Sequence, residues 1–110
     1  MRLKPWEIDG MVEAIETLFK KEELSLRAVE LRLYGSRSDD QKKGGDIDLL
    51  LRAPNDILSR VQDLKFRINI EMQKRIGEQK IDLLVIGDQN LPEEPFHRIA
   101  LKKSLLLKKW

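Results

Sequence analysis

Cysteine is absent from this chain of 110 residues, and histidine occurs once, as His97. The lack of cysteine excludes disulfides and thiolate metal sites, and it is typical of proteins in a reducing cytoplasm. Aromatic residues make up only 5% of the chain, too few for a surface that stacks single-stranded nucleic acid. No window approaches the roughly 18 apolar residues of a membrane-spanning helix, and the N-terminal segment lacks the apolar core of a signal peptide. We expect a soluble, cytoplasmic protein without membrane association.

Neither sign of charge dominates the sequence. Lysine and arginine number 21 against 19 aspartate and glutamate residues, which leaves a net charge of +2 at pH 7. This excess is too small to indicate nucleic-acid binding, so we expect no direct nucleic-acid partner. With 41% hydrophobic residues the chain can bury one modest core but not two. We therefore expect a single domain over residues 1–110.

The spacing of apolar residues predicts three helices and three strands in the order helix, strand, strand, helix, strand, helix. Apolar residues recur at intervals of three and four over residues 8–19 and 57–76, which predicts two amphipathic helices. Alternating or continuous apolar residues predict strands over 28–34, 46–52 and 80–88. The second strand is apolar on both sides, so we expect it at the centre of the sheet.

The ends of the helices carry further signals. Pro5 suits the first turn of the first helix, and Gly77 can end the second. We expect Trp6 to anchor the first helix against the core, as large aromatic side chains usually do. The last helix is predicted to begin after Pro95 and to include Leu105, so that the C-terminal segment packs as a helix with a basic, solvated end. His97 is predicted to be a surface or helix-packing residue, because a lone histidine makes no recognisable triad or zinc site.

Two carboxylates stand at the head of the second strand, with one residue between them. Since side chains alternate along a strand, Asp46 and Asp48 point to the same face. Like charges this close oppose each other's ionisation unless a cation lies between them. Asp82 interrupts the apolar run 81–86 of the third strand, and it can join the same cleft if the two strands are neighbours. Oxygen ligands of this kind suit Mg²⁺ or Mn²⁺ rather than zinc.

Three acids alone fit a nuclease, a phosphatase or a polymerase-type transferase. The chain breaks the first strand with Gly35 and Ser36, and nine residues separate Ser36 from Asp46. Glycine lets the backbone pass close to a ligand, and the amides that follow can bind phosphate oxygens together with the serine hydroxyl. The cationic candidates for the remaining phosphate charge are Arg37, Lys42, Lys43 and Lys80. A phosphate-binding turn beside paired metal ligands indicates a nucleoside triphosphate site.

The segments "YGSR", "DID" and "KIDLLVI" together resemble the minimal nucleotidyltransferase (MNT) branch of the nucleotidyltransferase superfamily with the DNA polymerase beta-like fold. The resemblance implies an α/β (α+β) fold, in which helices flank a small mixed β-sheet. By residue-wise match it implies that the nucleotide is bound by Gly35, Ser36 and Arg37. It implies that the catalytic residues, which also bind the metal, are Asp46, Asp48 and Asp82. The nine residues between the motifs are one fewer than in the usual MNT description, which leaves the conformation of that loop open.

The same resemblance implies a two-metal transfer of AMP from ATP, with two Mg²⁺ ions as cofactors. In this scheme Asp82 is the hypothetical acceptor of the proton from the attacking hydroxyl. MNT proteins are commonly encoded beside a partner of the HEPN class, and in such toxin–antitoxin pairs the transferase attaches AMP to the toxin ribonuclease. We therefore expect a protein adenylyltransferase that acts as an antitoxin.

Two alternatives to this function stay open. The chain could be a non-catalytic antitoxin that neutralises its partner by binding alone, although clustered acids that need a metal give such a module no advantage. It could also be a nucleotidyltransferase for a small-molecule acceptor, but a chain of this length lacks room for acceptor-binding elements without a partner or a dimer. Whether the chain forms a homo-oligomer is likewise left open.

Overall fold

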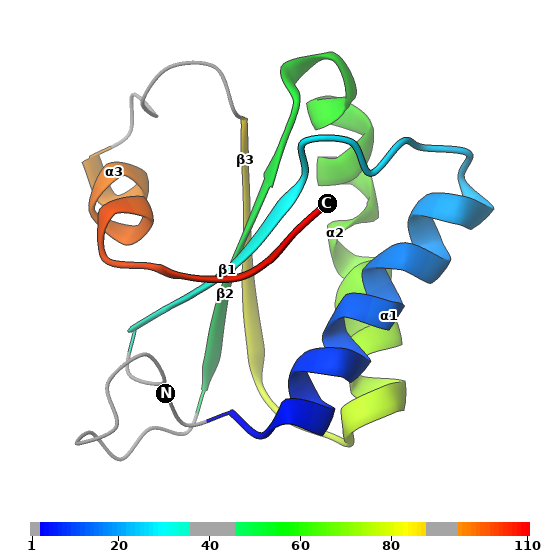
Figure 1. The fold of residues 1–110 in the computed structure, drawn as a ribbon, viewed down its shortest axis with the longest axis vertical. Helices are drawn as coiled ribbons and strands as arrows, with labels where there is room; N and C mark the ends of the chain where they lie inside the picture. Colours follow the sequence, from blue (N-terminus) through cyan, green and yellow to red (C-terminus); the bar gives the residue numbers. More distant parts are fainter. Residues whose placement is uncertain (1–2, 36–45, 88–94) are drawn as a thin grey trace.

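The computed structural model describes residues 3–35, 46–87 and 95–110. Within these ranges the chain forms a four-stranded mixed sheet with three helices (Figure 1), which confirms the predicted α+β class. The elements are, in chain order, α1 (Pro5–Lys21), β1 (Glu30–Tyr34), β2 (Ile47–Ala53), α2 (Asn55–Ile76), β3 (Ile81–Gly87), α3 (Pro95–Lys102) and β4 (Leu105–Lys109).

The strands lie in the order β3-β2-β1-β4. β2 runs parallel to β3, whereas β1 is antiparallel to both β2 and β4. The predicted central position of the second strand is confirmed, because β2 has a partner strand on each side. Leu49 and Leu50 are both fully buried although consecutive side chains of a strand point to opposite faces, so both faces of β2 are covered.

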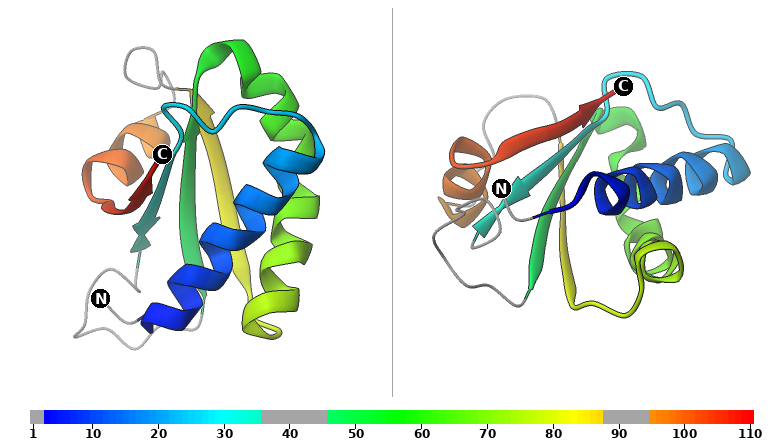
Figure 2. Two further views of the ribbon diagram at one scale, coloured as in Figure 1. Left: turned by 45° about the vertical axis from the view of Figure 1, so that its right-hand side comes forward. Right: turned by 60° about the horizontal axis from the view of Figure 1, so that its bottom comes forward.

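Helices cover the two faces of the sheet unequally. α1 and α2 pack together on one face, and α3 lies on the other (Figure 2). The larger core lies between the sheet and the α1–α2 pair, where Phe19 and Ile68 are fully buried against Leu49. On the α3 face a smaller cluster gathers around Leu50 and Ala100.

The predicted ends of the first two helices are confirmed. Pro5 stands in the first turn of α1, and the helix begins there with the Glu7 carboxylate accepting the Lys4 backbone N–H at 2.9 Å. The second oxygen of the buried Glu7 accepts a hydrogen bond from the Gln79 side-chain amide at 2.9 Å, which ties the start of α1 to the segment before β3. α2 ends at Gly77, whose φ of 92° lies in the left-handed region. Of the described helices, none combines the length and the apolar character that a bilayer crossing requires.

The prediction for the C-terminal segment was wrong. The last helix ends at Lys102, and Leu105, which was assigned to it, begins strand β4. The Ser104 hydroxyl donates to the Leu101 carbonyl at 2.7 Å and so satisfies one of the last carbonyls of α3. The chain then pairs with the edge of β1 that β2 leaves open. A short apolar run does not distinguish helix from strand by its pattern, and here the unpaired backbone groups of β1 decide.

The expected role of Trp6 was also wrong, since 54% of its surface is exposed. Trp6 lies three and seven residues before Asp9 and Glu13, so it shares their exposed face of α1. The second tryptophan, Trp110, packs against the larger core instead, and its indole N–H donates to the Glu16 carboxylate at 2.9 Å.

Candidate functional site

The predicted acids meet where β2 and β3 begin. Asp48 and Asp82 are paired in register across these parallel strands, and Asp46 stands one residue before β2. On its other side Asp48 is paired with Tyr34, the last residue of β1. Partners in register lie on the same face of a sheet. Since Tyr34 belongs to the cluster on the α3 face, the row Tyr34, Asp48 and Asp82 lies on that face as well.

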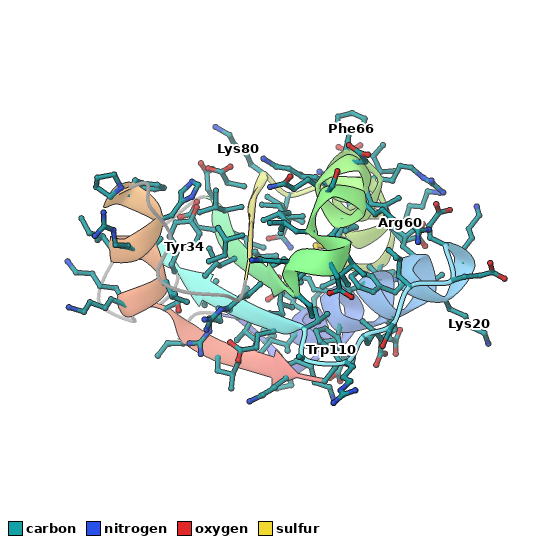
Figure 3. The ribbon with its side chains drawn as sticks, turned by 90° about the horizontal axis from the view of Figure 1, so that it is seen from above. Lys20, Tyr34, Arg60, Phe66, Lys80 and Trp110 are labelled. Carbon is teal, nitrogen blue, oxygen red and sulfur yellow. The ribbon has the colours of Figure 1, made fainter. Side chains whose placement is uncertain are left out.

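A lysine occupies the entrance of β3 beside the acids. The Lys80 ammonium lies 3.5 Å from the Asp46 carboxylate, and the Lys80 carbonyl accepts the Ile47 backbone N–H at 2.9 Å. The Lys80 side chain is 79% exposed, so this ion pair contributes little stability. Figure 3 shows Lys80 at the margin of the molecule. The pairing places one of the predicted phosphate-neutralising cations next to the first acid of the motif.

Negative charge accumulates at this end of the sheet. Burial raises the pKa of the Asp48 carboxyl, and the neighbouring charges of Asp82 and Asp46 raise it further, while Lys80 partly opposes them. The pKa of the Tyr34 phenol is also raised, to about 12. Burial is the largest cause, followed by the charges of Asp82 and Asp48. The charges of Asp82 and Asp46 thus disfavour ionisation of Asp48, which is the electrostatic condition that a bound cation relieves.

Gly35 is packed against Asp48. Its φ of 77° lies in the left-handed region, and a Cβ atom at this position would overlap the Asp48 carboxylate. The start of the predicted phosphate-binding turn therefore lies directly against Asp48. Ser36 and Arg37, predicted to bind the nucleotide, fall outside the described residues, as do Lys42 and Lys43.

The donor set fits a divalent cation in its chemistry, because Mg²⁺ prefers carboxylate oxygens and water. The side chains are nevertheless not gathered around one point: in the part of the chain that the structure describes, no group of three or more His, Cys, Asp or Glu residues could hold a metal ion as arranged. The fold brings Asp48 and Asp82 together, whereas Asp46 is turned into its ion pair with Lys80. A metal would have to draw the three carboxylates closer.

Sequence reasoning missed an aromatic row next to the acids. The rings of Tyr34 and Phe96 meet edge to face, with centroids 6.2 Å apart and planes at 76°. His97 flanks Phe96 in the same manner, at 6.3 Å and 65°. His97 is partly buried, in keeping with the packing role predicted for it. The available signal was Tyr34 itself, a bulky aromatic directly before the Gly-Ser break, but only the folded position of α3 brings Phe96 to it.

No protein-family model and no curated protein matches this sequence. The four-stranded mixed sheet and three helices of the described residues are consistent with an α+β nucleotidyltransferase-like fold. The case for a function therefore depends on the residues of this chain and on their geometry.

Proposed function

We propose that the chain is a Mg²⁺-dependent nucleotidyltransferase that transfers AMP from ATP to a hydroxyl group of a partner protein. The observation that carries the proposal is the register of β2 and β3, which pairs Asp48 with Asp82. Two like charges held opposite each other in a sheet are destabilising, so their placement on adjacent strands favours a role in binding a cation. Gly35, packed against Asp48, supports a phosphate site at the same place.

In this proposal Asp46, Asp48 and Asp82 hold the metal. When bound, Mg²⁺ supplies positive charge for the triphosphate and lowers the pKa of an attacking hydroxyl. Asp82 is the exposed member of the set, which supports its predicted role as acceptor of the hydroxyl proton. Lys80 balances the charge of Asp46 and lies where it can also contact a phosphate.

The proposed acceptor is a toxin ribonuclease of the HEPN class, which makes the chain a cytoplasmic antitoxin. Among the described strands β3 pairs only with β2, so Asp82 lies on an edge strand of the sheet. An exposed carboxylate on an edge strand is accessible to a bulky acceptor such as a protein side chain. The proposal therefore agrees with the openness of the site as well as with its charge.

The test is transfer of label from α-labelled ATP, with Mg²⁺, to the protein encoded by the neighbouring gene. We expect wild type to label that protein, and the double variant Asp46→Asn, Asp48→Asn to lose roughly 100-fold or more of the rate. The matched control is Asp9→Asn, Asp63→Asn, which removes two exposed helix carboxylates and should transfer like wild type.

Other outcomes identify the alternatives. If wild type transfers no label, yet wild type and the Asp46→Asn, Asp48→Asn variant neutralise the partner equally, the chain is a binding-only antitoxin. Label recovered on a small molecule in a cell extract, with none on the partner protein, would instead indicate a nucleotidyltransferase for a small-molecule acceptor.

A further inference from the structure

Three rings meet at one place in a chain that has few aromatic residues. This aromatic row consists of Tyr34, Phe96 and His97. It begins at the acids, because Tyr34 is the register partner of Asp48. Figure 3 shows Tyr34 on the side of the sheet that α3 covers. The row therefore connects the carboxylates with the first turn of α3.

The two ends of the row differ in exposure. Tyr34 is 8% exposed and fixed in the small core, whereas 55% of the Phe96 surface is accessible. The edge-to-face contact with Tyr34 orients the Phe96 ring, and the buried Ala100 anchors α3 one turn further on. An aromatic ring that is accessible and already oriented binds a planar partner at a low entropic cost.

The parts of the proposed nucleotide are arranged in the same order as the acids and the aromatic row. Its ribose separates the phosphates from the base, as Tyr34 separates Asp48 from Phe96. We infer that Phe96 is the stacking surface for the base of the nucleoside triphosphate, and that the aromatic row is the base subsite of this protein. The inference rests on the proposed function, and it adds the ring that holds the base. Stacking on an aromatic side chain contributes about 1–3 kcal/mol per base.

The neighbouring residue Ile99 provides a matched control. Ile99 is also 55% exposed, is apolar and lies on the same helix, but no ring contact places it in the row. Removal of either side chain changes the apolar surface of α3 to a similar extent. A difference between the two variants therefore reports on the aromatic ring rather than on exposed apolar area.

The experiment is a calorimetric titration of the full chain in Mg²⁺ with ATP and, separately, with inorganic tripolyphosphate, which lacks base and ribose. We expect Phe96→Leu and Phe96→Ala to weaken ATP binding by about 5- to 150-fold, which is the stacking energy converted to affinity. Their affinity for tripolyphosphate should stay within about twofold of wild type, because the phosphate site is intact. Phe96→Tyr, which restores an aromatic face, and Ile99→Ala should bind both ligands like wild type.

Each other outcome contradicts the inference. If Phe96→Leu binds ATP as tightly as wild type, Phe96 does not stack on the base, and the proposed function is unaffected. Equal weakening of ATP and tripolyphosphate shows that Phe96 only supports the fold. Loss of partner-protein binding with unchanged ATP affinity assigns Phe96 to a docking surface. If wild type binds neither ligand, the proposed function fails together with the subsite.

Discussion

At the scale of single residues, Tyr34 reports directly on the acidic end of the sheet. Burial, Asp82 and Asp48 raise the pKa of its phenol from 10.0 to about 12. Tyr34 is the only tyrosine of the chain, so phenolate absorbance during an alkaline titration belongs to this residue alone. We expect a midpoint near 12 in the native protein and near 10 in urea. Asp82→Asn should lower the native midpoint, and a native midpoint near 10 would contradict the placement of the ring.

The same shift sets a pH dependence of stability. Because the native pKa exceeds that of the unfolded chain, the unfolded chain releases the phenol proton first as the pH rises. The free energy of unfolding should therefore decrease between about pH 10 and 12. The part of this decrease that comes from Tyr34 should be absent in the Tyr34→Phe variant. The measurement is urea unfolding at several pH values for the two proteins.

Gly35 offers a second test at this scale, since Gly77 is its natural control. Both residues have positive φ, but a Cβ atom at Gly35 would overlap Asp48, whereas one at Gly77 meets nothing within 4 Å. Gly77→Ala should cost only the backbone strain, about 1–3 kcal/mol in the free energy of unfolding. Gly35→Ala should cost about 1–3 kcal/mol more, because Asp48 has to move. Equal losses in urea unfolding would show that Gly35 and Asp48 are not in contact.

At the scale of elements, β4 is held at its end by Trp110. The indole packs against the larger core and donates to Glu16 of α1, so it links the last strand to the first helix. We expect Trp110→Phe to lower the free energy of unfolding by about 1 kcal/mol through loss of this hydrogen bond. Trp6→Phe, at the exposed tryptophan, should change it by less than about 0.5 kcal/mol. The reverse order in thermal or urea unfolding would restore the anchoring role that the sequence predicted for Trp6.

The elements also show where prediction from sequence succeeds. The strands over β1, β2 and β3 were predicted to within two residues of their bounds, because alternation and apolar runs follow from backbone geometry. β4 was missed, because Leu105 and Leu106 pair with Leu33 and Arg32 of β1 across about seventy residues of chain. No local pattern contains that partner.

At the scale of the whole molecule, the larger core and the candidate site lie on opposite faces of the sheet. The α1–α2 face carries the larger core, with fully buried side chains from both helices, such as Met11 and Met72. The α3 face carries a smaller core and the paired acids Asp48 and Asp82. Of the helices in residues 3–35, 46–87 and 95–110, the eight-residue α3 is the one on this face, and Asp82 and Phe96 are both exposed there. Such a division lets a site hold like charges without loss of the fold.

The sequence by itself determined which residues could carry chemistry. Alternation along a strand predicts that Asp46 and Asp48 face one way, and a glycine at a strand end predicts a tight turn, so Asp46, Asp48 and Gly35 are local inferences. Only the tertiary structure decided that Asp82 pairs with Asp48, that Lys80 is the ion-pair partner of Asp46, and that Phe96 meets Tyr34. These contacts join segments that are distant in the chain. They result from strand order and helix packing, which a local sequence pattern does not contain.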